Sequence, residues 1–125
     1  MKLDDAKILI ADDSILVHKQ LKDTINMIAS PMLIDAKNGQ EAIDQYKEHK
    51  PDLVFLDIVM PVKDGIAAIK EIKEFDPKAY IVVVSSVGTQ QQLKEAILAG
   101  AADFLQKPLY APQIVQFLRH TFEGR

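Results

Sequence analysis

Residues 53–61 have the sequence LVFLDIVMP, in which four apolar residues are followed directly by an acid, Asp57. A short, continuous apolar run that is closed by a turn former, here Pro61, is typical of a strand buried on both faces of a sheet. Carboxylates are seldom buried unless a partner compensates their charge. The stretch therefore predicts an inner strand at 53–56 with one carboxylate at its carboxyl end, and this carboxylate needs a binding partner.

Similar apolar runs occur at four other places, separated by amphipathic stretches whose apolar residues recur at helical spacing. Strands that alternate with helices across short loops are typical of βαβ units, which form a parallel sheet with helices on both faces. Right-handed crossovers then favour a doubly wound, three-layer α/β/α domain. The five predicted strands are 7–11, 32–37, 53–56, 80–85 and 103–106.

Polar residues mark where the predicted helices begin, because their side chains can accept hydrogen bonds from the first free N–H groups. In the helix after Thr89, Leu93 and Ile97 are expected to face the core, and Gly100 is expected to end the helix. The last helix is expected to have Pro112 in its first turn. The candidate caps are Asp13 or Ser14, Asn38 paired with Glu41 as in a capping box, and Thr89 paired with Gln92.

Composition excludes several classes of function. The chain of 125 residues has the size of one domain, so a single domain over 1–125 is expected. A net charge of -3 without a cluster of lysines or arginines argues against nucleic acid or a membrane as partner. The absence of cysteine removes disulfides, thiolate nucleophiles and cysteine zinc sites. Because the chain has no long apolar run and no signal-peptide core, its expected location is the cytoplasm.

Chemically active side chains follow four of the five predicted strands. In a doubly wound domain the carboxyl ends of the strands meet at one edge of the sheet, and ligands bind there. We therefore expect three acids, a hydroxyl and a lysine to lie close together. They are Asp12 and Asp13 after 7–11, Asp57 after 53–56, Ser85 at the end of 80–85, and Lys107 after 103–106.

This group of side chains favours phosphoryl transfer. Three carboxylates held together repel one another, and a divalent cation removes that repulsion. Oxygen ligands without histidine or cysteine favour a hard ion, which is Mg²⁺ or Mn²⁺ in its place. Lys107 and the hydroxyl of Ser85 can contact phosphoryl oxygens, and Asp57 can act as a nucleophile that forms an aspartyl phosphate. Each residue alone also fits an ordinary structural role, as a cap, a strand end or a surface charge.

Four stretches of the chain occur in an order that is found in one family. They are ILIADDS at 8–14, LVFLDIVMPVKDG at 53–65, IVVVSS at 81–86 and AGAADFLQKPL at 99–109. Each stretch alone is weakly specific, but the ordered set closely resembles the CheY-like receiver domain of bacterial two-component response regulators over essentially the whole chain. The resemblance implies a flavodoxin-like, CheY-like fold with the strand order 2-1-3-4-5.

The resemblance also implies a role for each acid. Asp57 would accept a phosphoryl group from a histidine kinase or a histidine phosphotransfer protein. Asp13 and Asp57 would bind Mg²⁺ directly, together with the backbone carbonyl of Val59, and Asp12 would act through a water molecule. The chain would catalyse only its own phosphorylation and dephosphorylation and would not be a turnover enzyme.

Other residues that match the family would contact the phosphoryl group or report its presence. Ser85 and Lys107 would contact phosphoryl oxygens, and the Lys107–Pro108 peptide bond would be cis. Ser85 stands where threonine is common in the family, and Phe104 stands where tyrosine or another aromatic residue is usual. These two residues would form a switch that acts on the face made by the fourth helix, the fifth strand and the fifth helix, where a downstream protein would bind.

Two valines are predicted to set the lifetime of the phosphorylated form. Val59 lies two residues after Asp57, and Val87 lies two residues after Ser85. Neither aliphatic side chain can hydrogen-bond a water molecule, and both can crowd its approach to phosphorus. We therefore expect slow loss of the phosphoryl group.

Several alternatives accompany this assignment. A stand-alone, chemotaxis-type monomer is favoured over a phosphorelay intermediate, a receiver cut from a longer regulator, or a protein that dimerises on phosphorylation. A flavin-binding flavodoxin-like protein would need a hydroxyl-rich phosphate loop where this chain has ADDSILVH. A phosphatase of the haloacid dehalogenase type would need an acid in place of Val59, and no P-loop motif is present. His18, His49 and His120 show no metal-ligand spacing and are expected at the surface.

Overall fold

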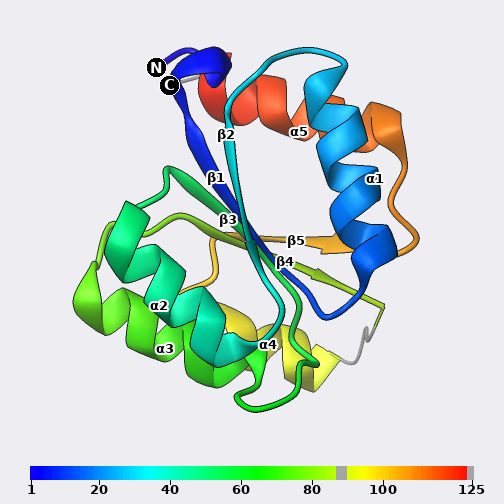
Figure 1. The fold of residues 1–125 in the computed structure, drawn as a ribbon. Coiled ribbons are helices and arrows are strands. Elements are labelled where there is room, and N and C mark those ends of the chain that lie inside the picture. Colours follow the sequence, from blue (N-terminus) through cyan, green and yellow to red (C-terminus); the bar gives the residue numbers. More distant parts are fainter. Residues whose placement is uncertain (87–89, 124–125) are drawn as a thin grey trace.

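Within residues 1–86 and 90–123, which the computed structural model describes, five parallel strands form one sheet in the order β2-β1-β3-β4-β5 (Figure 1). The strands are β1 (Lys7–Ala11), β2 (Met32–Ala36), β3 (Leu53–Leu56), β4 (Ile81–Ser85) and β5 (Asp103–Gln106). All five predicted strands are confirmed to within one residue at each end. The strand order is the one that the family resemblance implied.

Helices cover both faces of the sheet, as predicted for a three-layer α/β/α fold. In the described part of the chain they are α1 (Ile15–Asn26), α2 (Gly39–His49), α3 (Gly65–Phe75), α4 (Gln90–Ala99) and α5 (Ala111–Glu123), and a short 3₁₀ helix, η1 (Leu3–Asp5), precedes β1. Helices α1 and α5 pack together on one face, and α2, α3 and α4 lie side by side on the other (Figure 1). None of these helices is long and apolar enough to span a lipid bilayer.

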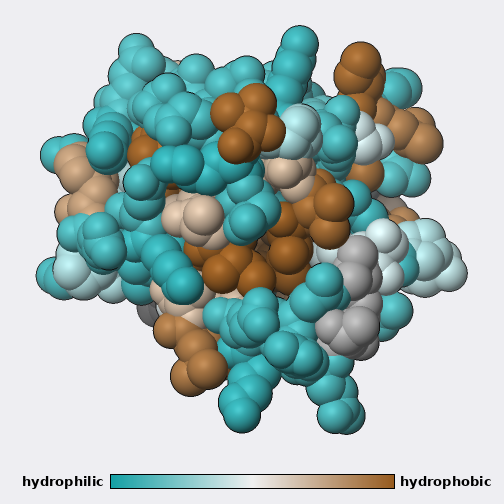
Figure 2. All heavy atoms as spheres, turned by 90° about the horizontal axis from the view of Figure 1, so that it is seen from below, coloured by the Kyte–Doolittle hydropathy of each residue, from teal (hydrophilic) through white to brown (hydrophobic). Residues whose placement is uncertain are grey.

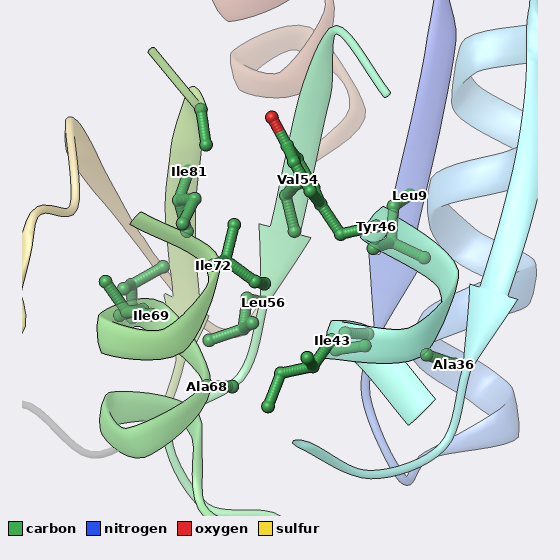
Figure 3. Close-up of a cluster of buried hydrophobic side chains, with 14 of the residues drawn as sticks. Leu9, Ala36, Ile43, Tyr46, Val54, Leu56, Ala68, Ile69, Ile72 and Ile81 are labelled. Atoms are coloured by element: carbon green, nitrogen blue, oxygen red, sulfur yellow. The ribbon is translucent and has the colours of Figure 1, made fainter. Parts of the chain in front are cut away.

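The core consists of two apolar layers, one on each face of the sheet. Successive side chains of a strand point to opposite faces, so the four buried residues of β3 are divided between the layers. Leu53 and Phe55 face α1 and α5, whereas Val54 and Leu56 face α2 and α3. Figure 3 shows the second layer, in which helix side chains close over β3; they are Ile43, Tyr46, Ala68, Ile69 and Ile72. The predicted inner strand is therefore confirmed.

Two of the predicted helix caps are confirmed, those of α1 and α2, with one difference at α2. Asn38 Oδ1 accepts a hydrogen bond from the N–H of Glu41 at 2.8 Å, and Ser14 Oγ caps α1. The carboxylate of Glu41 does not return to the N–H of Asn38 but accepts from the N–H of Lys37 at 3.1 Å. The side-chain amide of Asn38 donates to the other oxygen of Glu41 at 3.2 Å. The N–H of Glu41 in the first turn of α2 therefore has a hydrogen-bond partner, and so does the N–H of Lys37 just before the helix.

Helix α4 buries a different side from the one predicted. Ile97, which was expected to face the core, is 56% exposed, and Leu93 is only half-buried. The buried residue is Ala96, whose small side chain lets α4 pack closely against the core while the larger side chains turn outward. Gly100 ends the helix as predicted, with a φ of 121° that residues with a β-carbon rarely adopt. The predicted Thr89 cap lies outside the described residues.

The outer surface of the layer formed by α2, α3 and α4 is the side seen in Figure 2, where apolar side chains gather in a hollow between hydrophilic rims. A cavity of about 460 Å³ lies between the loop after β3, α3 and α4. Its lining includes Val59, Met60, Ile66, Gln92 and Glu95. Val59 is thus exposed close to the end of β3, where the acid of the opening stretch lies.

We expect Thr121→Val to stabilise the protein. Thr121 on α5 is buried, and its hydroxyl is the one buried side-chain polar atom of the described residues that lacks a hydrogen-bond partner. An unpaired buried hydroxyl carries a desolvation cost of roughly 1–3 kcal/mol, so replacing it by a methyl group of similar shape should raise the free energy of unfolding by about 1 kcal/mol. Urea denaturation followed by circular dichroism measures this change.

The control for this prediction is Thr121→Ser, which keeps the hydroxyl and removes the methyl group. It should lower the free energy of unfolding, because buried apolar surface is lost. A valine variant that is less stable than the wild type would show that the hydroxyl has a partner in solution.

Candidate functional site

An ammonium group lies between two buried carboxylates at the carboxyl edge of the sheet. Lys107, which follows β5, places its Nζ 2.9 Å from Oδ2 of Asp12 and 3.3 Å from Oδ2 of Asp57. Asp57 is only 7% exposed and Asp12 is still less so, which leaves both carboxylates poorly solvated. Lys107 therefore compensates two buried negative charges with a single positive one, and the site keeps an excess of negative charge.

Asp13 adds a third carboxylate to this edge. One carboxylate oxygen from each of Asp12, Asp13 and Asp57 lies within 4.8 Å of the others. Asp13 is exposed whereas the other two acids are buried, so the cluster opens to solvent on the side of Asp13. All of these ligand atoms are oxygens, and together they suit a hard divalent cation such as Mg²⁺, which takes one or two carboxylates and keeps several water molecules.

Backbone hydrogen bonds set the positions of the two buried acids. The N–H of Asp12 donates to the carbonyl of Ala36 on β2, and the N–H of Asp57 donates to the carbonyl of Ala11 on β1, both at 3.0 Å. The ladders of the sheet thus continue one residue beyond β1 and β3. The carboxylate of Asp57 also accepts a hydrogen bond from the N–H of Val59 at 3.2 Å. Both acids are held by the rigid sheet and not by a free loop.

Two glycines let the loop after β3 fold back against this site. A β-carbon at Gly65 would lie 2.2 Å from the carbonyl oxygen of Asp57, and one at Gly39 would lie 2.1 Å from the carbonyl oxygen of Lys63. The N–H of Gly65 donates to the carbonyl of Ile58 at 2.8 Å, and that of Gly39 donates to Lys63 at 3.0 Å. The loop is therefore fixed to α2 and to its own strand, a constraint that sequence reasoning missed.

The environment raises the pKa of Asp57 and the pKa of Lys107. Burial raises the pKa of Asp57 above its ordinary value, and the charge of Asp12 raises it further, although Lys107 opposes both effects. Burial by itself would lower the pKa of Lys107, but the hydrogen bonds and charges of Asp12 and Asp57 outweigh it and raise that pKa. Lys107 therefore remains a cation, and the ionised form of Asp57 is the costly member of the pair.

The other predicted residues that the structure describes lie on β4, on β5 and directly after β5. Ser85 is fully buried at the end of β4, and its backbone carbonyl accepts a hydrogen bond from the N–H of Lys107 at 3.0 Å. The Lys107–Pro108 peptide bond is cis, as the resemblance implied. Phe104 on β5 is partly buried and packs against the core layer under α2, α3 and α4. Val87 lies outside the described residues.

His18 lies close to the acidic cluster, where sequence reasoning did not place it. It was expected at the surface, but only 12% of its side chain is exposed. Its Nδ1 lies 2.8 Å from Oδ1 of Asp35, and its Nε2 lies 2.7 Å from the carbonyl oxygen of Asp12. The available signal was its position one helical turn after the cap Ser14, because helical side chains point back toward the N-terminus.

The family model for the response regulator receiver domain matches residues 8–119, a range that contains the whole site. The chain belongs to this family. All the stretches that carried the resemblance begin and end within the matched residues. Membership sets aside the flavin-binding alternative, which rested on the shape of the sheet alone.

Known receiver proteins match this receiver domain over most of their length. The chemotaxis protein CheY of Bacillus subtilis (strain 168) is 42% identical over 115 residues, which cover 92% of this chain and 96% of that protein. CheY of Thermotoga maritima is 46% identical over 112 residues, with 90% and 93% covered. The crystal structure of a CheX–CheY–BeF₃–Mg²⁺ complex from Borrelia burgdorferi superposes with a TM-score of 0.88 at 35% identity and covers 94% of this chain and 89% of that one.

In the absence of divalent cations, Asp57→Asn should stabilise this receiver domain at neutral pH. Because the pKa of Asp57 is raised in the native state, its ionisation costs stability as the pH rises above the ordinary aspartate value of 3.8. The amide carries no charge and avoids this cost. The gain should be present at pH 7 and should vanish only as the pH falls well below 3.8, because both states then bind the proton.

Urea denaturation in EDTA at pH 7 and at a pH well below 3.8 measures this difference. Asp23→Asn is the matched control, because Asp23 forms only an exposed ion pair with Lys19 on α1 and should change stability little at either pH. If Asp57→Asn were less stable than the wild type at pH 7, the attraction of Lys107 would outweigh the cost of burial.

Proposed function

We propose that this receiver domain accepts a phosphoryl group on Asp57 from a histidine kinase or a histidine phosphotransfer protein, with Mg²⁺ bound at the acidic cluster. The observation that carries the proposal is the meeting of three carboxylates with the ammonium group of Lys107 at one sheet edge. Asp57 follows directly on β3, whose residues are all buried, and it is the acid that the family resemblance assigns as the acceptor. The roles of the residues below are proposed on the same ground.

The cation would be held by Asp13 and Asp57, by Asp12 through water and by the backbone carbonyl of Val59. Bound there, Mg²⁺ would neutralise the negative charge that otherwise repels a phosphate, and Mn²⁺ would serve in its place. Oxygen ligands on two strand ends, one acid exposed and two buried, support this assignment. Asp13 faces solvent, so the phosphoryl donor and the cation would both enter from that side.

The transfer would proceed by nucleophilic attack. A carboxylate oxygen of Asp57 attacks phosphorus, the bond from phosphorus to the donor's imidazole nitrogen breaks, and the electron pair of that bond stays on the nitrogen, which later takes a proton. Once Asp57 is phosphorylated, its side chain no longer carries the carboxylate charge that Lys107 contacted. Lys107 then pairs with a phosphoryl oxygen, and the hydroxyl of Ser85 donates a hydrogen bond to another phosphoryl oxygen. Positioning and charge neutralisation carry such a reaction, with little need of acid–base groups.

The phosphoryl group would be reported to the face formed by α4, β5 and α5. Movement of Ser85 toward the phosphoryl group would leave space into which Phe104 turns, so the signal is a shift between two existing states. Phe104 is only partly buried, which leaves it room for this change. A downstream protein would then bind exposed residues of the face, among which we propose Gln91, Glu95 and Tyr110.

The cellular role we propose is that of a stand-alone, chemotaxis-type regulator in the cytoplasm. It is supported by the CheY relatives, whose own lengths are almost fully matched. The chain would act as a monomer and would turn over only its own phosphoryl group. A phosphorelay intermediate, a receiver within a longer regulator and dimerisation on phosphorylation are the competing assignments.

Incubation with acetyl phosphate and Mg²⁺ should add one phosphoryl group to the wild type and none to Asp57→Asn. The amide of asparagine is not a comparable nucleophile, so the loss should be complete within detection. Intact-mass spectrometry measures the added phosphoryl group. Asp44→Asn is the control, since Asp44 is exposed and contacts only Gln40, and it should be labelled normally. Stoichiometric labelling of Asp57→Asn would move the acceptor to another residue.

The phosphorylated form should lose its phosphoryl group faster when Val59→Asn and Val87→Glu are combined. Val59 is exposed beside Asp57 and cannot hydrogen-bond the water that attacks phosphorus, whereas a polar pair can orient that water. Positioning effects of this kind contribute up to several kcal/mol in favourable cases, roughly tenfold or more in rate. A decay time course at fixed Mg²⁺ and pH measures the two rates.

Val62→Asn is the control for this rate comparison. Val62 lies in the same loop, is 83% exposed and has a φ of 68°, which asparagine adopts more readily than valine. This variant introduces the same polar group away from Asp57, so its decay should match that of the wild type. A double variant that decays at the wild-type rate would show that the valines only pack the loop, and one that decays more slowly would show the opposite of the proposed effect.

A further inference from the structure

His18 connects the acidic cluster to β2 through both of its ring nitrogens. Nε2 lies 2.7 Å from the carbonyl oxygen of Asp12, and because a carbonyl oxygen only accepts, the ring donates at this atom. Nδ1 lies 2.8 Å from the carboxylate of Asp35 on β2. The side chain reaches these partners from the first full turn of α1, pointing back toward the start of the helix. One ring thus joins α1, β2 and the residue after β1.

The contact fixes a peptide plane and not only an oxygen atom. The carbonyl of Asp12 belongs to the planar peptide unit that also carries the N–H and the Cα of Asp13. Holding this carbonyl therefore restricts the direction in which the side chain of Asp13 leaves the backbone. The N–H of Asp12, which belongs to the preceding peptide plane, donates to the carbonyl of Ala36 at 3.0 Å. The backbone of Asp12 is therefore held on both of its sides.

The ring itself is held firmly from the far side. Asp35 faces His18 with Oδ1 and the ammonium group of Lys22 with Oδ2, so its carboxylate is fixed at both oxygens. Burial by itself would raise the pKa of Asp35, but the hydrogen bonds and charges of Lys22 and His18 outweigh it and lower that pKa, so the carboxylate can accept. The side chain of His18 is 12% exposed, so few water molecules compete for its two hydrogen bonds. The acidic cluster itself consists of Asp12, Asp13 and Asp57, so His18, Asp35 and Lys22 supply no oxygen to it.

We propose that His18 is a positioning residue for the cation site: by holding the Asp12 carbonyl it sets the direction of the Asp13 carboxylate, and Asp35 acts through it. This inference rests on the proposed function, since it concerns Mg²⁺ at the cluster. Residues that orient metal ligands typically contribute roughly 10–100-fold in metal affinity. His18 acts before any phosphoryl donor arrives, by preparing the ligand geometry.

The test is Mg²⁺ binding to the unphosphorylated protein, measured by isothermal titration calorimetry and by the shifts of the Asp13 and Ser14 backbone amides. His18→Ala should weaken binding by roughly tenfold or more. His18→Arg should restore most of the affinity, because the guanidinium group can donate to the carbonyl and to the carboxylate of Asp35 at once. Lys19→Ala, which removes only an exposed ion pair from the same helix, should bind as the wild type does.

A double-variant cycle shows whether Asp35 acts through the ring. Asp35→Ala should weaken binding in the wild type and should have a much smaller further effect in the His18→Ala protein, because contacting groups in one network are not additive. An equal effect in both backgrounds would overturn the link through His18. Unfolding in EDTA is measured alongside, and rescue by arginine separates positioning from loss of helix stability.

The outcomes distinguish this inference from the proposed function. If the wild type binds no Mg²⁺, both fail. If the wild type binds Mg²⁺ and His18→Ala binds equally well, the inference about His18 fails while the acidic cluster keeps its role. If His18→Ala and His18→Arg are weakened alike, the ring does not act through its contacts with the Asp12 carbonyl and the Asp35 carboxylate, and the inference is again overturned.

Discussion

A carboxylate at the end of a doubly buried strand must have its charge compensated, and the arrangement of this receiver domain follows from that constraint. Asp57 directly follows β3, whose four residues are all buried, and burial raises the pKa of Asp57. The strand order places β1 beside β3, which brings Asp12 next to Asp57. The charge of Asp12 makes ionisation of Asp57 still less favourable. Lys107, delivered by β5, supplies one positive charge for two negative ones. The remaining negative charge is what a divalent cation would neutralise.

The rigid and adjustable parts of the site have different physical origins. Asp12 and Asp57 continue the hydrogen-bond ladders of the sheet, so they move only with the core. The loop after β3 is fixed by close backbone contacts at Gly39 and Gly65, which exclude any larger residue. Asp13, by contrast, is exposed, and its direction depends on the peptide plane that His18 holds. Phosphoryl transfer depends on positioning, so side chains that hold ligands in place matter as much as the ligands.

The parts of the molecule that follow from local pattern were predictable, and those that depend on contacts between distant residues were not. Apolar runs predicted all five strands, and the residues after them predicted the acidic edge, because parallel strands bring their carboxyl ends together. The buried side of α4 was predicted wrongly, because the small Ala96 packs against the core and the larger Ile97 is exposed. His18 and Gly39 act through partners far along the chain, and neither residue type signals such a contact by itself.

The central claim is that Asp57 is a buried carboxylate whose ionised form needs a cation, and direct titration of this group tests it. The ¹³C resonance of the Asp57 carboxyl carbon, assigned by its loss in Asp57→Asn, can be followed with pH in EDTA and in saturating Mg²⁺. The account predicts a pKa above 3.8 in the metal-free protein and a clear fall when Mg²⁺ is added, because the cation stabilises the carboxylate. A metal-free pKa at or below 3.8, or one that Mg²⁺ leaves unchanged, would contradict it.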